Sequence, residues 1–155
     1  MKNYYDNTEN NPPNQNIKYF INVIKPTPST AIELGCGAGR DTVYLIRNGW
    51  NVLAIDKNDV QERITNHLTE EELQRFRFSK QKFEEVELEQ TNLIVSNFSL
   101  SFCDKDKFKE LWKKIQENIK KDRIFCWQFF GSKWRMEYCR NKKNIFYKRA
   151  GREFI

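Results

Sequence analysis

The sequence predicts an α/β fold in which a doubly wound, mostly parallel sheet carries helices on both faces. Three observations predict it. Short apolar runs alternate with segments of helical periodicity along most of the 155 residues. One run, residues 31–34, leads directly into a glycine-rich turn and a helical segment. A second run, residues 52–55, ends in Asp56, about 20 positions after Gly35, which is the spacing of a nucleotide-binding βαβ unit. At this length we expect one domain.

The glycine-rich turn has glycine at three alternate positions, Gly35, Gly37 and Gly39. Glycine adopts positive φ easily and has no Cβ, so a ligand can approach its backbone closely. We expect the N–H groups of this turn, and the N-terminus of the helix after it, to face a ligand. We expect Asp56 to accept hydrogen bonds from ribose hydroxyls. The competing interpretations are a glycine turn of an unrelated α/β protein and Asp56 as a helix cap or turn residue.

The spacing of the glycines separates two classes of nucleotide-binding protein. A dinucleotide-binding G-x-G-x-x-G fingerprint needs glycine at position 40, where the chain has Arg40. The pattern E-x-G-x-G-x-G from Glu33 to Gly39 resembles motif I of the class I S-adenosylmethionine-dependent methyltransferases. Residues 33–41 and 52–58 are similar to the small bacterial, tellurite-resistance-like branch of that family. The resemblance covers about residues 4–134 and implies a Rossmann-like fold with S-adenosyl-L-methionine as cofactor.

The resemblance and the strand ends together give a set of candidate cofactor-binding residues. The glycine turn would approach the methionine part of the cofactor and Asp56 its ribose. Glu33 would engage the ammonium group, since its charge is costly to bury without such a partner. Family members commonly carry an acid-Phe pair near the adenine; Phe83 matches the Phe, but Lys82 replaces the acid. The full set is Glu33, Gly35, Cys36, Gly37, Ala38, Gly39, Arg40, Asp56, Lys57, Phe83, Asn97 and Phe98.

The N-terminal part of the chain precedes the first strand. Residues 1–16 are polar, and we expect a flexible, irregular arm. Its Tyr4 and Tyr5 either help to close the pocket, as a similar arm lies near the cofactor in related methyltransferases, or pack loosely at a free terminus. The apolar spacing i, i+3, i+4, i+7 within residues 17–24 predicts an amphipathic helix that is stopped by Pro26.

Periodicity and turn residues place the remaining elements in order. The helix after the glycine turn covers residues 40–48, because Gly49 is a typical residue after a helix end. Asp59 can cap the next helix, whose buried stripe is Val60, Ile64 and Leu68. The further elements are a strand at 75–81, a strand at 92–98, a helix at 108–119 and a strand at 124–130. Asn97 and Phe98 lie at the carboxyl end of their strand, where open α/β sheets bind ligands.

The resemblance fades after about Trp134. The methyltransferase sheet has seven strands, of which the last two form an antiparallel edge hairpin. Residues 132–155 form a basic, atypical tail that is too short for the missing helix and both strands, and only 144–148 looks strand-like. We therefore expect an incomplete strand 6/7 hairpin and an apolar edge at the fifth strand or its neighbour, where a homodimer could form. A reading-frame change after Trp134 is one hypothesis, and the genomic DNA would test it.

Composition excludes several classes of function. Up to Gly131 the chain has 19 basic and 19 acidic residues, and the remainder has 8 basic and 2 acidic, so the net charge of +6 lies in the tail. A nucleic-acid partner is therefore not expected. No apolar run could span a membrane, and residues 1–13 lack the apolar core of a signal peptide, which favours a cytoplasmic protein. Four cysteines without a C-x-x-C pair, and the single His67, favour reduced thiols and no metal site. We read His67 as structural or exposed.

These observations favour an S-adenosylmethionine-dependent methyltransferase that acts on a small-molecule acceptor. We assign no catalytic residue, because the sequence shows no triad, metal cluster or carboxylate pair, and a soft nucleophile needs no dedicated base. The alternative is a truncated, non-catalytic protein of the same fold that binds cofactor or a partner. An NAD-dependent oxidoreductase is disfavoured by Arg40, and a nucleic-acid methyltransferase has only the basic tail in its favour.

Overall fold

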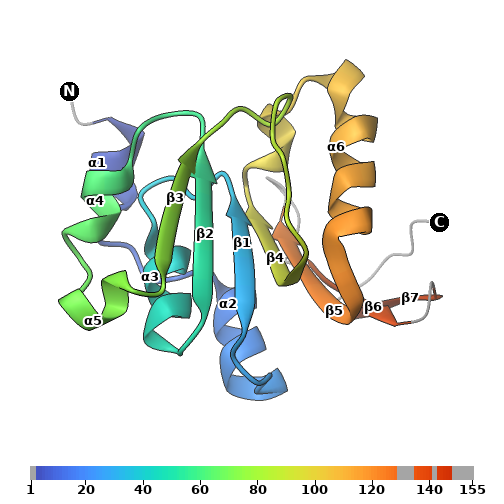
Figure 1. Ribbon diagram of the computed structural model, residues 1–155, viewed down its shortest axis with the longest axis horizontal. Helices are drawn as coiled ribbons and strands as arrows, with labels where there is room; N and C mark the ends of the chain where they lie inside the picture. The colour runs from blue at the N-terminus through green and yellow to red at the C-terminus, as the bar shows by residue number, and fades with distance from the viewer. Residues whose placement is uncertain (1–2, 129–134, 141–142, 148–155) are drawn as a thin grey trace.

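The computed structural model describes residues 3–128, 135–140 and 143–147. It is built on a seven-stranded sheet with the order β3-β2-β1-β4-β5-β6-β7 (Figure 1). The strands are β1 Thr30–Leu34, β2 Asn51–Asp56, β3 Phe76–Lys80, β4 Thr91–Asn97, β5 Ile119–Gln128, β6 Arg135–Arg140 and β7 Lys143–Tyr147. Neighbouring strands from β3 to β5 are parallel, whereas β6 and β7 are added antiparallel. The predicted doubly wound, mostly parallel α/β fold is confirmed.

Helices cover both faces of this sheet. They are α1 Tyr4–Thr8, α2 Gln15–Tyr19, the π-helix η1 Phe20–Ile24, α3 Arg40–Arg47, α4 Gln61–Thr65, α5 Glu70–Leu73, the 3-10 helix η2 Leu100–Phe102 and α6 Lys105–Asn118. On one face, Phe20 and Leu45 pack with Val52 and other strand residues. On the opposite face, Leu111 of α6 packs with Ile32 and its neighbours (Figure 1). Side chains alternate along each strand, so both faces contribute to the core.

The strand order places a crevice at the carboxyl ends of β1 and β4. After β1 the chain crosses through α3 to β2 on one side, and it later returns to β4 on the other side of β1. Connections that leave two adjacent strands in opposite directions open a crevice there, where ligands bind in such sheets. The glycine turn follows β1 directly, and β4 ends at Asn97. The fold therefore brings the two predicted halves of the site together.

The N-terminal segment is more regular than expected. Residues 4–8 form α1, whose first turn is closed by a capping box. The Asn3 side chain accepts a hydrogen bond from the Asp6 backbone N–H, and the Asp6 carboxylate accepts one from the Asn3 backbone N–H. The prediction of an irregular arm over residues 1–16 is wrong there. The expected helix at 17–24 is divided into α2 and η1, and the wider π-turn leaves Ile24 39% exposed.

Other boundaries differ in smaller ways. α4 covers only residues 61–65, and Val60 rather than Asp59 is its cap residue. β5 begins at Ile119, five positions before the expected strand, because Thr91 pairs with Ile119 before a bulge in the β4 ladder. Among the described residues, no helix combines the length and the apolar character needed to cross a membrane.

The C-terminal strands correct a second prediction. Both β6 and β7 are present, so the expected lack of a complete hairpin is wrong, while the strand expected near 144–148 is confirmed as β7. β5 pairs with β4 on one side and β6 on the other, so it is not an open edge. The outer strands of the sheet are β3 and β7. The other residues of the predicted tail, 132–134, 141–142 and 148–155, lie outside the described residues.

Candidate functional site

A pocket of about 610 Å³ lies at the carboxyl edge of the sheet, where the crevice was expected. Its wall combines the glycine turn, the ends of β2 and β4, the segment 81–84, and residues of the N-terminal segment. The predicted residues that line it are Glu33, Gly35, Cys36, Gly37, Ala38, Arg40, Asp56, Lys57, Phe83, Asn97 and Phe98. Of the predicted set, only Gly39 is not part of this wall.

The three glycines of the turn serve different purposes. All have positive φ, between 57° and 80°. A Cβ on Gly39 would lie 2.4 Å from Cγ1 of Ile64, so this glycine allows α4 to pack against the turn. A Cβ on Gly35 would lie 2.3 Å from Cβ of Ser99, which brings β4 close to β1. A Cβ on Gly37 would meet nothing closer than Tyr4 Cε1 at 3.6 Å, on the pocket side. Gly37 alone keeps the backbone accessible from the pocket.

The backbone of the turn is already hydrogen-bonded within the protein. The N–H groups of Gly35 and Cys36 both donate to the Ile55 carbonyl, at 2.8 and 3.0 Å. Gly39 N–H donates to the Cys36 carbonyl at 3.0 Å. The expectation that these N–H groups face a ligand is therefore corrected. The turn offers close approach to its backbone, and its shape is fixed before any ligand arrives.

Asp56 stabilises the turn and faces the pocket at the same time. Its Oδ2 accepts from Gly37 N–H at 2.9 Å, and its Oδ1 accepts from Asn58 N–H at 3.0 Å. A carboxylate has about four acceptor positions, so each oxygen retains one for a ligand. The side chain is almost buried, at 8% exposed, yet it lines the pocket. Asp56 is thus held in one orientation from which it can accept two hydroxyl hydrogen bonds.

Glu33 is a buried carboxyl group that forms no direct ion pair among the described residues, and the Arg40 charge favours its ionised form less than burial disfavours it. It is 4% exposed, faces the pocket, and accepts a hydrogen bond from the Thr42 hydroxyl. Burial raises the pKa of Glu33 well above its usual value, and the nearby Asp41 carboxylate raises it further. A ligand cation in the pocket would therefore have a strong electrostatic partner here.

A polar cluster beside Glu33 was not predicted. Asp41, 1% exposed, accepts from the Asn14 backbone N–H at 2.7 Å, from Asn14 Nδ2 at 2.6 Å and from Asn97 Nδ2 at 2.8 Å. Asn97 also exchanges hydrogen bonds with the buried Asn16, at 2.6 and 3.1 Å. The cluster ties the N-terminal segment, α3 and β4 together at the pocket wall. Its partners lie 27 to 81 positions apart in the chain, and no local motif signals it.

The N-terminal segment forms one side of the pocket through Tyr4, Tyr5 and Thr8. The Tyr5 hydroxyl accepts from Asn58 Nδ2 at 2.5 Å, and the two tyrosine rings meet edge to face with centroids 5.6 Å apart. Burial is the main cause that raises the pKa of Tyr5, which therefore stays protonated at neutral pH. Of the two interpretations of these tyrosines, their contribution to the pocket wall is the one that the structure supports.

The opposite side of the pocket is aromatic. Phe83 lies beside the turn, with its Cζ 3.2 Å from where a Gly35 Cβ would be. Phe98 follows β4 with a φ of 59°, an uncommon conformation for a bulky residue and one that clusters at functional sites. Phe102 on η2 lines the pocket although it is 68% exposed. Lys82 also lines the wall, where the resemblance led us to expect an acid.

Metal and thiol chemistry have little support at this site. Among the described residues, no group of three or more His, Cys, Asp or Glu side chains is arranged to hold a metal ion. Cys36 lies in the wall, but burial raises the pKa of its thiol well above the usual value, which opposes the reactive thiolate form. His67 lies outside this wall, with Nε2 2.9 Å from Glu9 Oε1, as a structural role requires.

A family model described as tellurite resistance protein TehB matches residues 1–123. This chain belongs to the TehB family. The predicted membership of the class I S-adenosylmethionine-dependent methyltransferases, in the tellurite-resistance-like branch, is thereby confirmed. The match covers the pocket residues of this TehB-family chain, from the N-terminal segment to η2. No curated protein matches the chain.

Solved structures support the same fold for this TehB-family chain. TehB from Haemophilus influenzae has a TM-score of 0.63 and 21% identity, over 74% of this chain and 40% of that one. The glycopeptide N-methyltransferase MtfA, complexed with S-adenosyl-L-methionine, has a TM-score of 0.63 and 18% identity, over 72% of this chain and 51% of that one. The 1,6-didemethyltoxoflavin-N1-methyltransferase of Burkholderia thailandensis has a TM-score of 0.63 and 20% identity, over 79% of this chain and 55% of that one. The chain thus spans about half the length of these proteins or less.

Proposed function

We propose that this chain binds S-adenosyl-L-methionine in the 610 Å³ pocket and transfers its methyl group to a small-molecule acceptor. The observation that carries the proposal is the pair of buried carboxyl groups, Glu33 and Asp56, on either side of an accessible glycine backbone. The cofactor offers ribose hydroxyls and an ammonium group, which are donors that suit these two acceptors. Glu33 forms no direct ion pair among the described residues, and its carboxylate is a group with which a ligand ammonium could pair.

The residues of the chain would bind and orient rather than react. Asp56 would hold the ribose, Gly37 would admit the methionine part beside the backbone, and Glu33 would pair with its ammonium group. Phe83 would supply an apolar surface for the adenine. When bound, the cofactor supplies an electrophilic methyl group on a sulfonium, so that the protein contributes position and electrostatics. No catalytic side chain is assigned.

The proposal of a small acceptor is supported by the shape of the site and by similar proteins. The pocket is concave and lined on one side by Phe98 and Phe102, as small-molecule sites usually are. The structure of the Burkholderia thailandensis enzyme contains 1,6-didemethyltoxoflavin, and coclaurine N-methyltransferase, also similar in fold, was solved with N-methylheliamine. These two ligands belong to those proteins, and they support the class of acceptor only.

Isothermal titration with S-adenosyl-L-methionine and with S-adenosyl-L-homocysteine tests the proposal. We expect saturable binding by the wild-type protein and a loss of about 10- to 100-fold in affinity for Asp56→Asn, which removes the charge of an acceptor. Asp59→Asn is the matched control, because the same change falls on an exposed residue outside the pocket. A folded wild-type protein that binds neither compound would contradict the proposal.

A second measurement separates the enzyme from the non-catalytic alternative. S-adenosyl-L-homocysteine release is followed while small thiol, amine and oxyanion acceptors are added to the wild-type protein with cofactor. Release that depends on one acceptor supports the transferase, and its loss in Asp56→Asn would link turnover to the pocket. Cofactor binding without release for any acceptor class would favour the non-catalytic protein.

A further inference from the structure

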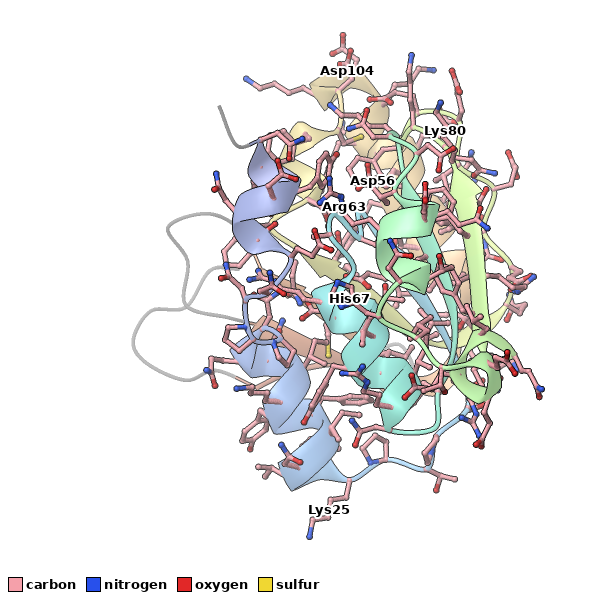
Figure 2. The ribbon with its side chains drawn as sticks, turned by 90° about the vertical axis from the view of Figure 1, so that its left-hand side faces the viewer. Lys25, Asp56, Arg63, His67, Lys80 and Asp104 are labelled. Atoms are coloured by element: carbon pink, nitrogen blue, oxygen red, sulfur yellow. The ribbon has the colours of Figure 1, made fainter. Side chains whose placement is uncertain are left out.

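The helix α1 forms one wall of the pocket although none of its residues is buried. Its Tyr5 packs, half-buried, against the core cluster that contains Val60 and Ile64, and polar contacts add to this apolar contact in fixing the position of α1. The polar contacts between α1 and distant parts of the chain come from α4 and from the loop before α4. Figure 2 shows Arg63 between the two helices, with Asp56 nearby.

Arg63 on α4 contacts three residues of the N-terminal segment at once. Its Nη2 lies 3.0 Å from Asp6 Oδ1, and its Nη1 donates to Glu9 Oε2 at 2.5 Å. Its guanidinium carbon lies 5.9 Å from the centroid of the Tyr5 ring, within cation–π range. The hydrogen bond to Glu9, more than that to Asp6, raises the pKa of Arg63, so the guanidinium is always charged. A planar guanidinium is the cation that suits this threefold contact.

These contacts reach the pocket through Tyr5. Arg63 itself is not part of the pocket wall, whereas Tyr5 is. The Tyr5 ring is held by Arg63 on one side, and its hydroxyl is held by Asn58, which follows Asp56 in the chain. The other side of α4 is fixed, since Ile64 is fully buried and packs against Gly39. Arg63 thus connects α4 to the wall of the pocket that the N-terminal segment forms.

We propose that Arg63 is a positioning residue that holds α1 against the pocket and thereby sets how tightly and how long the ligand is bound. This inference rests on the proposed function of the pocket. Because α1 walls the pocket, ligand exchange is easier when α1 moves away. The Arg63 side chain is 29% exposed and its partners 37% and 22%, so the contacts break without opening the core. Partly exposed ion pairs weaken with salt.

The position of α1 is tested without any ligand by limited chymotrypsin digestion. Mass spectrometry follows cleavage after Tyr4 and Tyr5 in wild type, Arg63→Gln and Arg75→Gln. We expect cleavage about tenfold faster in Arg63→Gln, because two ion pairs and a ring contact are lost together. Arg75→Gln is the matched control, since Arg75 pairs with Glu71 four positions earlier, away from the pocket. Equal cleavage rates in all three proteins would overturn the inference.

The effect on the ligand is measured with S-adenosyl-L-homocysteine by titration and stopped flow. We expect Arg63→Gln to bind about tenfold more weakly, through faster dissociation and with a wild-type melting temperature. Arg63→Lys should restore part of the affinity, because it keeps the charge but loses the planar contact. Added NaCl should weaken binding more in wild type than in Arg63→Gln.

The outcomes distinguish this inference from the proposed function. Faster cleavage with unchanged affinity would overturn the positioning role of Arg63 while the binding site stands. Failure of the wild-type protein to bind would overturn both proposals, and the digestion would still show whether Arg63 holds α1.

Discussion

At the scale of single residues, the buried Glu33 makes the stability of the fold depend on pH. Its buried carboxyl group is favoured in the protonated form, because burial and Asp41 raise its pKa above the usual value of 4.5. Because the folded protein binds this proton more tightly than the unfolded chain does, Glu33 favours folding at low pH. This contribution to the free energy of unfolding is fully present below pH 4.5 and is lost as the pH rises through the pKa of the folded state. Above that pH the protein holds a charge that a ligand cation would balance.

Glu33→Gln should therefore raise the thermal stability of the ligand-free protein and weaken its binding of the cofactor. The amide keeps the shape of the protonated acid without titrating, so we expect a melting temperature a few degrees above wild type at pH 8 and a smaller difference at pH 5. At this chain length a change of 1 kcal/mol corresponds to roughly 2–4 °C. Circular dichroism of the ligand-free proteins measures it, with the exposed Glu62→Gln as control. A lower melting temperature for Glu33→Gln at pH 8 would contradict the prediction, as would unchanged cofactor affinity.

Residues in the glycine turn were predictable, and those that support them were not. Glu33, Gly37 and Asp56 are signalled by short-range spacing around two strand ends, which the sequence displays directly. Asp41 ends the stretch 33–41 that carries the resemblance, but its hydrogen bonds to Asn14 span 27 positions, and nothing local marks Asn14. Chain segments that meet only in the folded protein leave no periodic signal.

At the scale of elements, the glycine turn allows a prediction with an internal control. Gly37 and Gly39 both have positive φ, but a Cβ would clash only at Gly39, against Ile64. We expect Gly37→Ala to lower the free energy of unfolding by about 1–2 kcal/mol, because the only cost is that of placing alanine in the left-handed conformation. Gly39→Ala should lower it by about 2–5 kcal/mol, because overpacking against α4 is added. Urea denaturation of the two variants measures both, and equal losses would contradict the packing role of Gly39.

The helix α1 is one of the elements that the sequence analysis did not predict. Its capping residues, Asn3 and Asp6, lie three positions apart in a segment without apolar periodicity, so the prediction of an irregular arm was reasonable. Such a short helix is marginal on its own. It is contacted by Asn58, its cap residue Glu9 by Arg63, each more than fifty positions away, and its Tyr5 packs against a buried core cluster. In contrast, α3 and α6 were predicted because their buried residues recur with helical spacing.

At the scale of the whole molecule, the order of the first strands followed from alternating apolar runs, but the C-terminal part did not. β5 begins among charged residues, and β6 follows without an apolar pattern that distinguishes strand from loop, whereas β7 matches the strand expected at 144–148. Strands added antiparallel at an edge need not be apolar on both faces. This is why the hairpin was expected to be incomplete although both strands are present.

The outer strand β3 should resist pairing with another molecule. Arg77 and Lys80 are exposed on it, and Arg77 forms an ion pair with Glu89. Charged side chains on an edge strand disfavour sheet extension. We expect the double variant Arg77→Val, Lys80→Val to self-associate more strongly than wild type in sedimentation velocity across a concentration series. Lys105→Val, Lys109→Val on exposed positions of α6 is the control. Equal association in all three proteins would show that β3 is not a latent interface.

The internally satisfied hydrogen bonds of the glycine turn have a consequence for how this pocket can change. Because Gly35, Cys36 and Gly39 already donate to protein carbonyls, the turn is held in its conformation by the protein itself. Preorganised backbone loses little conformational freedom on binding. Variation in the N-terminal segment can then alter the wall of the pocket without disturbing the turn. If the proposed function holds, the chain separates a constant part, the glycine turn, from an N-terminal wall that can diversify through mutation.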